Sequence, residues 1–227
     1  MRARGAILLV LTSALAAATA NPESLETILA RMDRAAASFK DMSADVRWLQ
    51  HTAAINQDAV DTGTILLKRS KHDIRMKVEF TAPDRKSVAL QGHKLEIYYP
   101  NTNTVEEYDT GKYREMLDQF LLIGFGTSGK ELAAAYTMKV LGNETVVDQP
   151  TTRLELIPKS AEMLKNLKKL EMWIADTNVY PVQQKFYLLG GDYRLVTYTN
   201  VKVNTGLRDA DLALKLPKDI KRVTPQK

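Results

Sequence analysis

The sequence predicts a mainly β protein in which about eleven antiparallel strands form one sheet, interrupted by short helices. Two observations indicate this class. Apolar and polar residues alternate with a period of two in much of the chain after Asp41, for example in Asp73–Thr81 (DIRMKVEFT). Residues typical of turns separate these runs at a spacing of roughly ten residues, as expected for an antiparallel meander.

The first twenty residues are predicted to be a signal peptide. Arg2 and Arg4 form a positive n-region, an apolar run (AILLVL) follows, and Ala18-Thr19-Ala20 offers small residues at a cleavage site. The alternative is a membrane anchor, which needs about 20 apolar residues, more than this run provides. We expect export, cleavage after Ala20 and a single domain over residues 21–227.

The composition indicates in which cellular compartment the protein acts and which classes of partner it binds. The chain has no cysteine, so we expect neither a disulfide nor a lipid anchor at the cleavage point. The net charge is +5, and basic residues alternate with acidic ones along the strands. A basic run with interleaved aromatics is missing from the sequence, which argues against nucleic-acid binding. We expect a soluble, monomeric protein of the periplasm that is not itself a lipoprotein.

The mature chain is predicted to open with an amphipathic helix. Asn21 can cap it, Pro22 suits its first position, and apolar residues recur at helical spacing from Leu25 to Phe39. Charged residues lie mostly on its other side. This helix is therefore expected to pack on an apolar surface.

Three more helical segments interrupt the strands. Lys112–Ile123 stops at Gly124, a short helix follows over residues 128–135, and residues 160–167 form one more helical turn. About eleven strands form a sheet wider than the eight-stranded barrel that its own side chains fill. A hollow is therefore expected, which the helices either cover while leaving room for a ligand or fill completely.

Several loose motifs run through the chain after Thr62. They comprise Gly63 leading a strand that ends in Lys68-Arg69, a turn at Pro83, Gly92-His93-Lys94-Leu95 followed by Tyr98-Tyr99-Pro100, Glu171-Met172-Trp173-Ile174 before a proline strand, and the closing LKLPKDIKRVTP. This pattern resembles the LolA-type outer-membrane lipoprotein carriers and related lipoprotein-sorting proteins. The resemblance implies an unclosed antiparallel β-barrel covered by α-helices that form a lid over an apolar cavity. It also implies a carrier that takes acyl chains from an inner-membrane donor complex and passes them to an outer-membrane acceptor.

The resemblance assigns a role to Arg69. In the family, the arginine that ends the first barrel strand holds the lid shut, and this position maps to Arg69. The alternation in TILLKR independently places Arg69 on the face of Ile65 and Leu67, near the rim, where a guanidinium needs acceptors. The last carbonyls of the helix over Lys112–Ile123 could supply them.

Other partners for Arg69 stay open. It could end its strand in water, or pair with Glu79 or Asp84. The family often has a proline after this arginine, and here the residue is Ser70, so the turn can differ.

The sequence offers no catalytic or metal-binding constellation. His51, His72 and His93 lack the carboxylate spacing of a metal site. Gly124–Gly129 (GFGTSG) lacks the preceding strand and following lysine of a phosphate loop. Trp173 could face either the hollow or the outside. We expect no metal, no cofactor and no enzymatic activity.

We predict a soluble periplasmic carrier that binds the acyl chains of lipoproteins or similar lipids and shuttles them toward the outer membrane. The predicted cavity lining is Ile65, Leu67, Ile74, Met76, Val78, Phe80, Leu95 and Ile97. The predicted lid is Met116, Leu117, Phe120, Leu121, Ile123 and Phe125, joined by Leu25, Ile28, Leu29 and Met32 of the first helix. The inward direction after Arg69 assumes that no bulge reverses the hairpin.

Three alternatives remain open on sequence grounds. One is a regulatory module of the same fold that senses lipids or lipoproteins, whose family members carry an additional C-terminal domain. Another is an enzyme built on this fold, which would need polar groups converging in the cavity. The third is a carrier for a different lipid.

Overall fold

The computed structural model describes residues 23–69, 74–111 and 123–225. Its strands form one 12-stranded sheet in the order β12-β6-β5-β4-β3-β2-β1-β11-β10-β9-β8-β7. The strands are β1 (Asp41–Thr52), β2 (Gln57–Arg69), β3 (Ile74–Ala82), β4 (Lys86–Gln91), β5 (Lys94–Tyr99), β6 (Thr104–Asp109), β7 (Tyr136–Val146), β8 (Gln149–Pro158), β9 (Leu167–Ala175), β10 (Pro181–Leu188), β11 (Tyr193–Val203) and β12 (Lys221–Val223). The predicted mainly β class is therefore confirmed.

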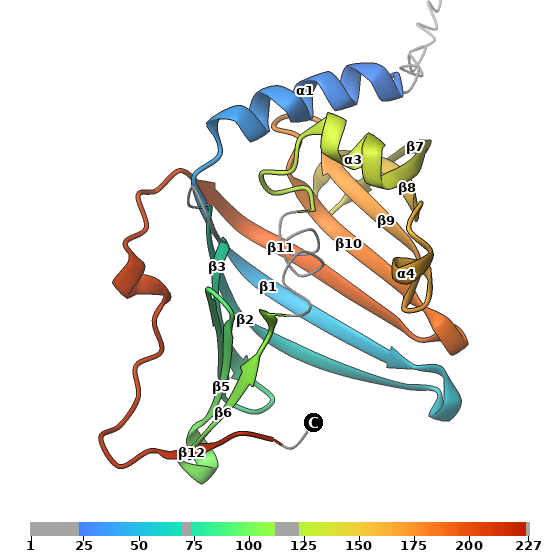
Figure 1. The fold of residues 1–227 in the computed structure, drawn as a ribbon. Helices are drawn as coiled ribbons and strands as arrows, with labels where there is room; N and C mark the ends of the chain where they lie inside the picture. The colour runs from blue at the N-terminus through green and yellow to red at the C-terminus, as the bar shows by residue number, and fades with distance from the viewer. Residues whose placement is uncertain (1–22, 70–73, 112–122, 226–227) are drawn as a thin grey trace, which may run out of the picture.

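The sheet is strongly curved and does not close. All neighbouring strands are antiparallel except β12, which pairs in parallel with β6. The strands β7 and β12 lie at opposite ends of the strand order. In Figure 1, β3 to β6 form one wall, β1, β2, β10 and β11 form the back, and the helices over Leu25–Ser38 and Gly129–Ala135 lie across the upper end. This is the unclosed sheet with helical cover that the resemblance implies.

The helix α1 (Leu25–Ser38) is the predicted first helix. The side chain of Ser24 caps it by accepting from the Thr27 amide, whereas the expected cap Asn21 and Pro22 lie outside the described residues. Two of its own side chains, Ile28 and Met32, are buried. The expected interior face of this helix is thus confirmed.

The helix α3 (Gly129–Ala135) packs closely beside α1. Ser128 and Glu131 form a capping box at its start. A Cβ atom at Gly129 would come within 2.4 Å of the Leu29 carbonyl oxygen, so only glycine allows this approach. The third helix, α4 (Ala161–Leu164), is shorter than the predicted turn over residues 160–167.

Two apolar clusters pack the interior around the hollow. The first joins the helices to the inner face of β7–β10: Ile28, Met32, Ile123, Leu132, Tyr136, Leu154, Leu156, Met163, Leu170, Met172, Ile174 and Val179. The second lies on the inner face of β1–β3 and β11: Phe39, Met42, Ala44, Val46, Leu67, Ile74, Val78, Phe80, Phe125, Val196 and Tyr198.

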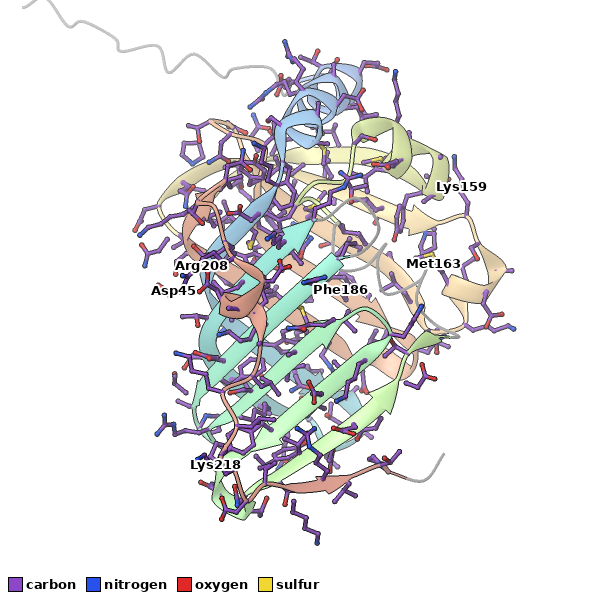
Figure 2. All side chains as sticks on the ribbon, turned by 60° about the vertical axis from the view of Figure 1, so that its left-hand side comes forward. Asp45, Lys159, Met163, Phe186, Arg208 and Lys218 are labelled. Atoms are coloured by element: carbon purple, nitrogen blue, oxygen red, sulfur yellow. The ribbon has the colours of Figure 1, made fainter. Side chains whose placement is uncertain are left out.

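The chain after β11 runs along the outside of the sheet before it forms β12. It is fixed where the Asp41 carboxylate accepts hydrogen bonds from the amides of Thr205 (2.7 Å) and Gly206 (3.1 Å). Figure 2 shows this segment from Arg208 down to Lys218. The predicted closing strand therefore exists, although it is only three residues long.

Two predictions fall on residues that the structure does not describe. The signal peptide (1–20) and the helix over Lys112–Ile123 lie outside the described ranges, apart from Ile123 itself. Within residues 23–69, 74–111 and 123–225, no helix is long and apolar enough to cross a membrane.

Candidate functional site: an apolar cavity with two different ends

The described residues enclose a cavity of about 460 Å³ inside the curve of the sheet. This volume lies within the range of about 300–1,000 Å³ that is usual for small-molecule sites. The described helices thus cover the hollow without filling it. The cavity is lined by Val46, Trp48, Gln50, Asp61, Ile65, Met76, Val78, Phe80, Lys86, Val88, Asn166, Leu167, Gln184, Phe186, Leu188, Arg194, Val196 and Tyr198.

Side chains from the two halves of the sheet meet at this cavity. The strands β1–β4 supply one wall and β10–β11 the other, although the two halves are far apart in the sequence. Phe186, labelled in Figure 2, belongs to the wall that β10 and β11 supply. The fold therefore creates the cavity by bending one continuous sheet.

Four of the eight residues predicted to line a cavity do line this one: Ile65, Met76, Val78 and Phe80. The register carries the inward direction across the hairpin, because Ile65 pairs with Val78 and Leu67 with Met76. A bulge that would have reversed these side chains is not present between these pairs. Their part in binding a lipid stays a prediction.

The other four residues differ from the expectation. Leu67 and Ile74 lie on the inner face but are packed in the second cluster, with Leu67 only 1 % exposed. Leu95 and Ile97 share the inner face with Leu90 and Val88, their partners on β4. They do not line the cavity because β5 lies one strand nearer the edge, and β4 is the last strand that contributes to the lining.

Residues 123–126 lie beside one end of the cavity, here called the lid end, where they contact the lining residues Tyr198 and Gln184. Phe125 is 2 % exposed and contacts Tyr180 (ring centroids 5.9 Å apart, stacked) and Tyr198 (5.0 Å, edge to face). Two described members of the predicted lid, Ile123 and Phe125, therefore lie at this end. The remaining members, Met116, Leu117, Phe120 and Leu121, lie outside the described residues.

A buried polar chain supports the lid end. The Gln184 side chain donates to the Ile123 carbonyl at 2.8 Å, and the Tyr198 hydroxyl donates to the Gln184 carbonyl oxygen at 2.8 Å. Burial raises the pKa of Tyr198, so its hydroxyl keeps its proton and acts as a donor. The Ile123 carbonyl, the Gln184 amide and the Tyr198 hydroxyl thus each have a hydrogen-bond partner, and these bonds hold residues 123–126 in position.

Arg69 contacts the same segment from the other side. Its Nη1 donates to the Gly126 carbonyl at 2.6 Å. Gly126 has a φ of +88°, and a Cβ atom there would come within 2.6 Å of the Phe39 ring. Among the described residues this acceptor is a loop carbonyl just after the predicted helix, whose own carbonyls, apart from that of Ile123, lie outside the described residues. In the described part of the chain, neither Glu79 nor Asp84 pairs with Arg69.

The opposite end of the cavity, here called the polar end, consists of Gln50, Asp61, Lys86 and Arg194. The Lys86 ammonium lies 3.0 Å from an Asp61 carboxylate oxygen, which also accepts from the Gln50 amide at 3.5 Å. Arg194 donates to the carbonyls of His51 (3.3 Å) and Tyr193 (3.1 Å).

The polar end was not predicted from the sequence. A signal was available, since Asp61, Lys86 and Arg194 each continue an inward-facing alternation: Asp61 with Gly63 and Ile65, Lys86 with Val88, and Arg194 with Val196. Arg69, the only polar residue predicted at the hollow, does not line the cavity itself.

The sequence left open whether Trp173 faces the hollow or the outside, and in the structure it lies on the outer face of the sheet. The Arg153 guanidinium stacks over its ring at 4.8 Å. The neighbouring Glu171 is 2 % exposed and accepts from Arg153 (2.5 Å), Lys169 (2.6 Å) and Tyr187 (3.0 Å). Burial opposes ionisation of Glu171, but these hydrogen bonds outweigh it and lower its pKa.

Of the histidines, the structure describes His51 and His93. His51 pairs with Asp58 at 2.7 Å and stacks on Tyr193, whereas His72 lies outside the described residues. Among the residues that the structure describes, no group of three His, Cys, Asp or Glu side chains could hold a metal ion.

In sequence, no protein-family model and no curated protein matches the chain. In structure it is similar to an uncharacterized conserved protein from Thermus thermophilus, with a TM-score of 0.55 and 14% identity over 89% of this chain and 100% of that one. It is also similar to the lipoprotein LppX from Mycobacterium tuberculosis, with a TM-score of 0.52 and 12% identity over 81% of this chain and 97% of LppX.

A third similar structure is MucB, with a TM-score of 0.52 and 13% identity over 84% of this chain. This chain spans only 62% of the MucB chain. A LolA superfamily protein from Nitrosomonas europaea also matches, at a lower TM-score of 0.38. At these identities the likeness establishes the fold alone: the chain shares with the Thermus thermophilus protein, LppX and MucB one fold, which here is an unclosed, mainly antiparallel sheet covered by helices.

Proposed function

We propose that this protein is a carrier that shields one or more acyl chains, of a lipoprotein or a similar lipid, in the cavity beneath residues 123–126. One observation carries the proposal: an apolar cavity of about 460 Å³ remains beneath a segment whose backbone is held by side chains from both halves of the sheet. An acyl chain offers only apolar surface, which matches this lining.

The hydrogen bonds of the lid end provide the means of release. Burying an acyl chain stabilises the complex by about 0.8 kcal/mol per methylene, so a long chain held without competition would leave very slowly. Phe125 occupies apolar surface beside Tyr198, a residue of the cavity wall. Closure of residues 123–126, with Arg69 donating to Gly126, competes with the acyl chain and lowers its net affinity.

The place of action follows from the carrier role and from the start of the sequence. We propose that residues 1–20 direct export and are removed, and that the domain 21–227 acts as a soluble monomer in the periplasm. It would take its cargo from a donor in the inner membrane and give it to an acceptor in the outer membrane. Lipid binding in this account needs no metal, cofactor or catalytic step.

A bulky substitution in the cavity wall tests the proposal. Ile65→Trp places an indole in the cavity, whereas Thr64→Trp places the same side chain on the outer face of the same strand. We expect the Ile65→Trp variant to bind a fluorescent fatty acid at least about tenfold more weakly than the wild-type protein does. The Thr64→Trp variant should bind it with the wild-type affinity. If wild-type protein binds no such probe, or if both variants bind it equally, the proposal is wrong.

A further inference from the structure

The polar end carries an excess of positive charge. The cavity wall includes two cations, Lys86 and Arg194, and one carboxylate, Asp61. The other polar side chains of the lining, Gln50, Asn166 and Gln184, are neutral. An apolar cavity with one uncompensated positive charge at a single end favours a ligand with an anionic group at one end.

Arg194 is oriented but not neutralised by its partners. Its Nη1 donates to the carbonyls of His51 and Tyr193, which carry no net charge. Of the described residues, no carboxylate lies within salt-bridge distance of Arg194. The guanidinium has five N–H donors, so donors remain for a further acceptor.

Lys86 is held in place at the same end. Asp61, which is 7 % exposed, accepts from its ammonium at 3.0 Å, and the ammonium lies 4.8 Å from the centroid of the Phe80 ring. Phe80 and Val78 continue the apolar wall from this point toward Met76. The structure thus has a fixed cation where the apolar lining begins.

We propose that the polar end binds the anionic head group, a carboxylate or a phosphate, of an amphiphile whose acyl chain runs along the cavity toward Tyr198. This inference rests on the proposed carrier function and specifies the class of lipid. Arg194 and Lys86 contact the head group, and Asp61 offsets part of their positive charge through its ion pair with Lys86.

Three ligands with the same chain and different head groups test the inference: palmitate, palmityl phosphate and palmityl alcohol. We expect the wild-type protein to bind at least one of the two anions about 10- to 100-fold more tightly than the alcohol, as displacement of a fluorescent fatty acid would measure. This is the usual effect of a hydrogen bond to a charged group. The tighter of the two anions identifies the head group.

Variants locate the effect at Arg194. Arg194→Gln should remove the preference for the anion while leaving the affinity for palmityl alcohol unchanged, and Arg194→Lys should restore part of it. Lys185→Gln removes a positive charge from the opposite face of β10, where the ammonium lies over the Tyr193 ring, and should change neither affinity. A thermal melt checks that each variant is folded.

The outcomes separate the two proposals. If wild-type protein binds the alcohol as tightly as both anions, or if Arg194→Gln leaves the anion preference intact, the inference is wrong while the carrier function stands. If none of the three ligands binds, the carrier function is wrong and this inference with it.

Discussion

The two ends of the cavity are stabilised by different interactions. At the lid end, neutral backbone carbonyls of Ile123 and Gly126 accept from Gln184 and Arg69, and Phe125 fills apolar space. At the polar end, the side chains of Asp61, Lys86 and Arg194 carry full charges. Carbonyl acceptors can be exchanged for water when residues 123–126 move, whereas the charges stay at the wall. Under the two proposals above, a lipid would enter or leave through the lid end and its head group would be bound at the polar end.

The largest expected effect is at the lid end. Phe125→Ala removes a buried ring that contacts Tyr180 and Tyr198, and should lower the free energy of unfolding by about 3–5 kcal/mol. Phe186→Ala, at a partly buried residue of the cavity wall, should cost clearly less. Urea denaturation of both variants measures the difference. Equal losses would mean that the lid end is no better packed than the cavity wall.

The next effect concerns Arg69. Arg69→Leu leaves the Gly126 carbonyl without its donor and should destabilise the closed segment by about 1.5–3 kcal/mol. Because closure competes with the lipid, palmitate should bind about 10- to 100-fold more tightly and leave correspondingly more slowly. Stopped-flow displacement measures the dissociation rate. Arg47→Leu, on the exposed outer face of β1, is the matched control. A dissociation rate equal to that of the control would refute the role of Arg69 in release.

At the polar end, stability and binding should respond in opposite directions. Asp61→Asn removes the carboxylate partner of Lys86 and should lower the free energy of unfolding by about 1–3 kcal/mol. The same change removes a negative charge beside the anionic head group, so palmitate should bind at least as tightly as before. Asp58→Asn, in an exposed pair with His51, serves as the control. Weaker palmitate binding in Asp61→Asn would contradict the charge argument.

The smallest effect is expected outside the cavity. The pKa of Glu171 is lowered in the folded state, so its ion pairs stabilise the fold above its ordinary pKa of 4.5, and this contribution is lost as the pH falls through the lower folded value. In the Glu171→Gln variant, the free energy of unfolding should therefore fall by about 1 kcal/mol less on acidification than it does in the wild-type protein. Palmitate binding at neutral pH should not change. An unchanged acid limb would show that the Glu171 network does not contribute to acid stability.

Much of the fold could be predicted because strand alternation reports which face a side chain occupies. Period two placed Val78 and Phe80 on one face of their strand, and their inward direction rested on the assumption that no bulge reverses the hairpin after Arg69. The β2–β3 register, in which Ile65 pairs with Val78, agrees with that assumption. The first helix was equally predictable from the helical spacing that buries Ile28 and Met32.

The extent of the cavity could not be predicted in the same way. Leu95 and Ile97 have the correct direction, but alternation does not tell at which strand a curved sheet ceases to enclose space. Curvature depends on how all twelve strands pack together.

The polar end was missed for a related reason. Lys86, Asp61 and Arg194 lie near the ends of their alternating runs, where a charged residue usually marks the start of solvent. Only the bending of the sheet brings β2 and β4 opposite β11, so that three charges far apart in the sequence line one cavity. The Gly126 carbonyl that accepts from Arg69 was not predicted either, because it belongs to a loop glycine with a φ of +88°.

The most direct test of the carrier function is the cargo itself. Protein purified from its native envelope, extracted with organic solvent and analysed by mass spectrometry, should yield an acyl-containing species in a fixed ratio to the protein. The Ile65→Trp variant purified in parallel should yield much less, and Thr64→Trp the wild-type amount. Absence of any acyl-containing species from the wild-type extract, or its equal presence in both variants, would contradict the account.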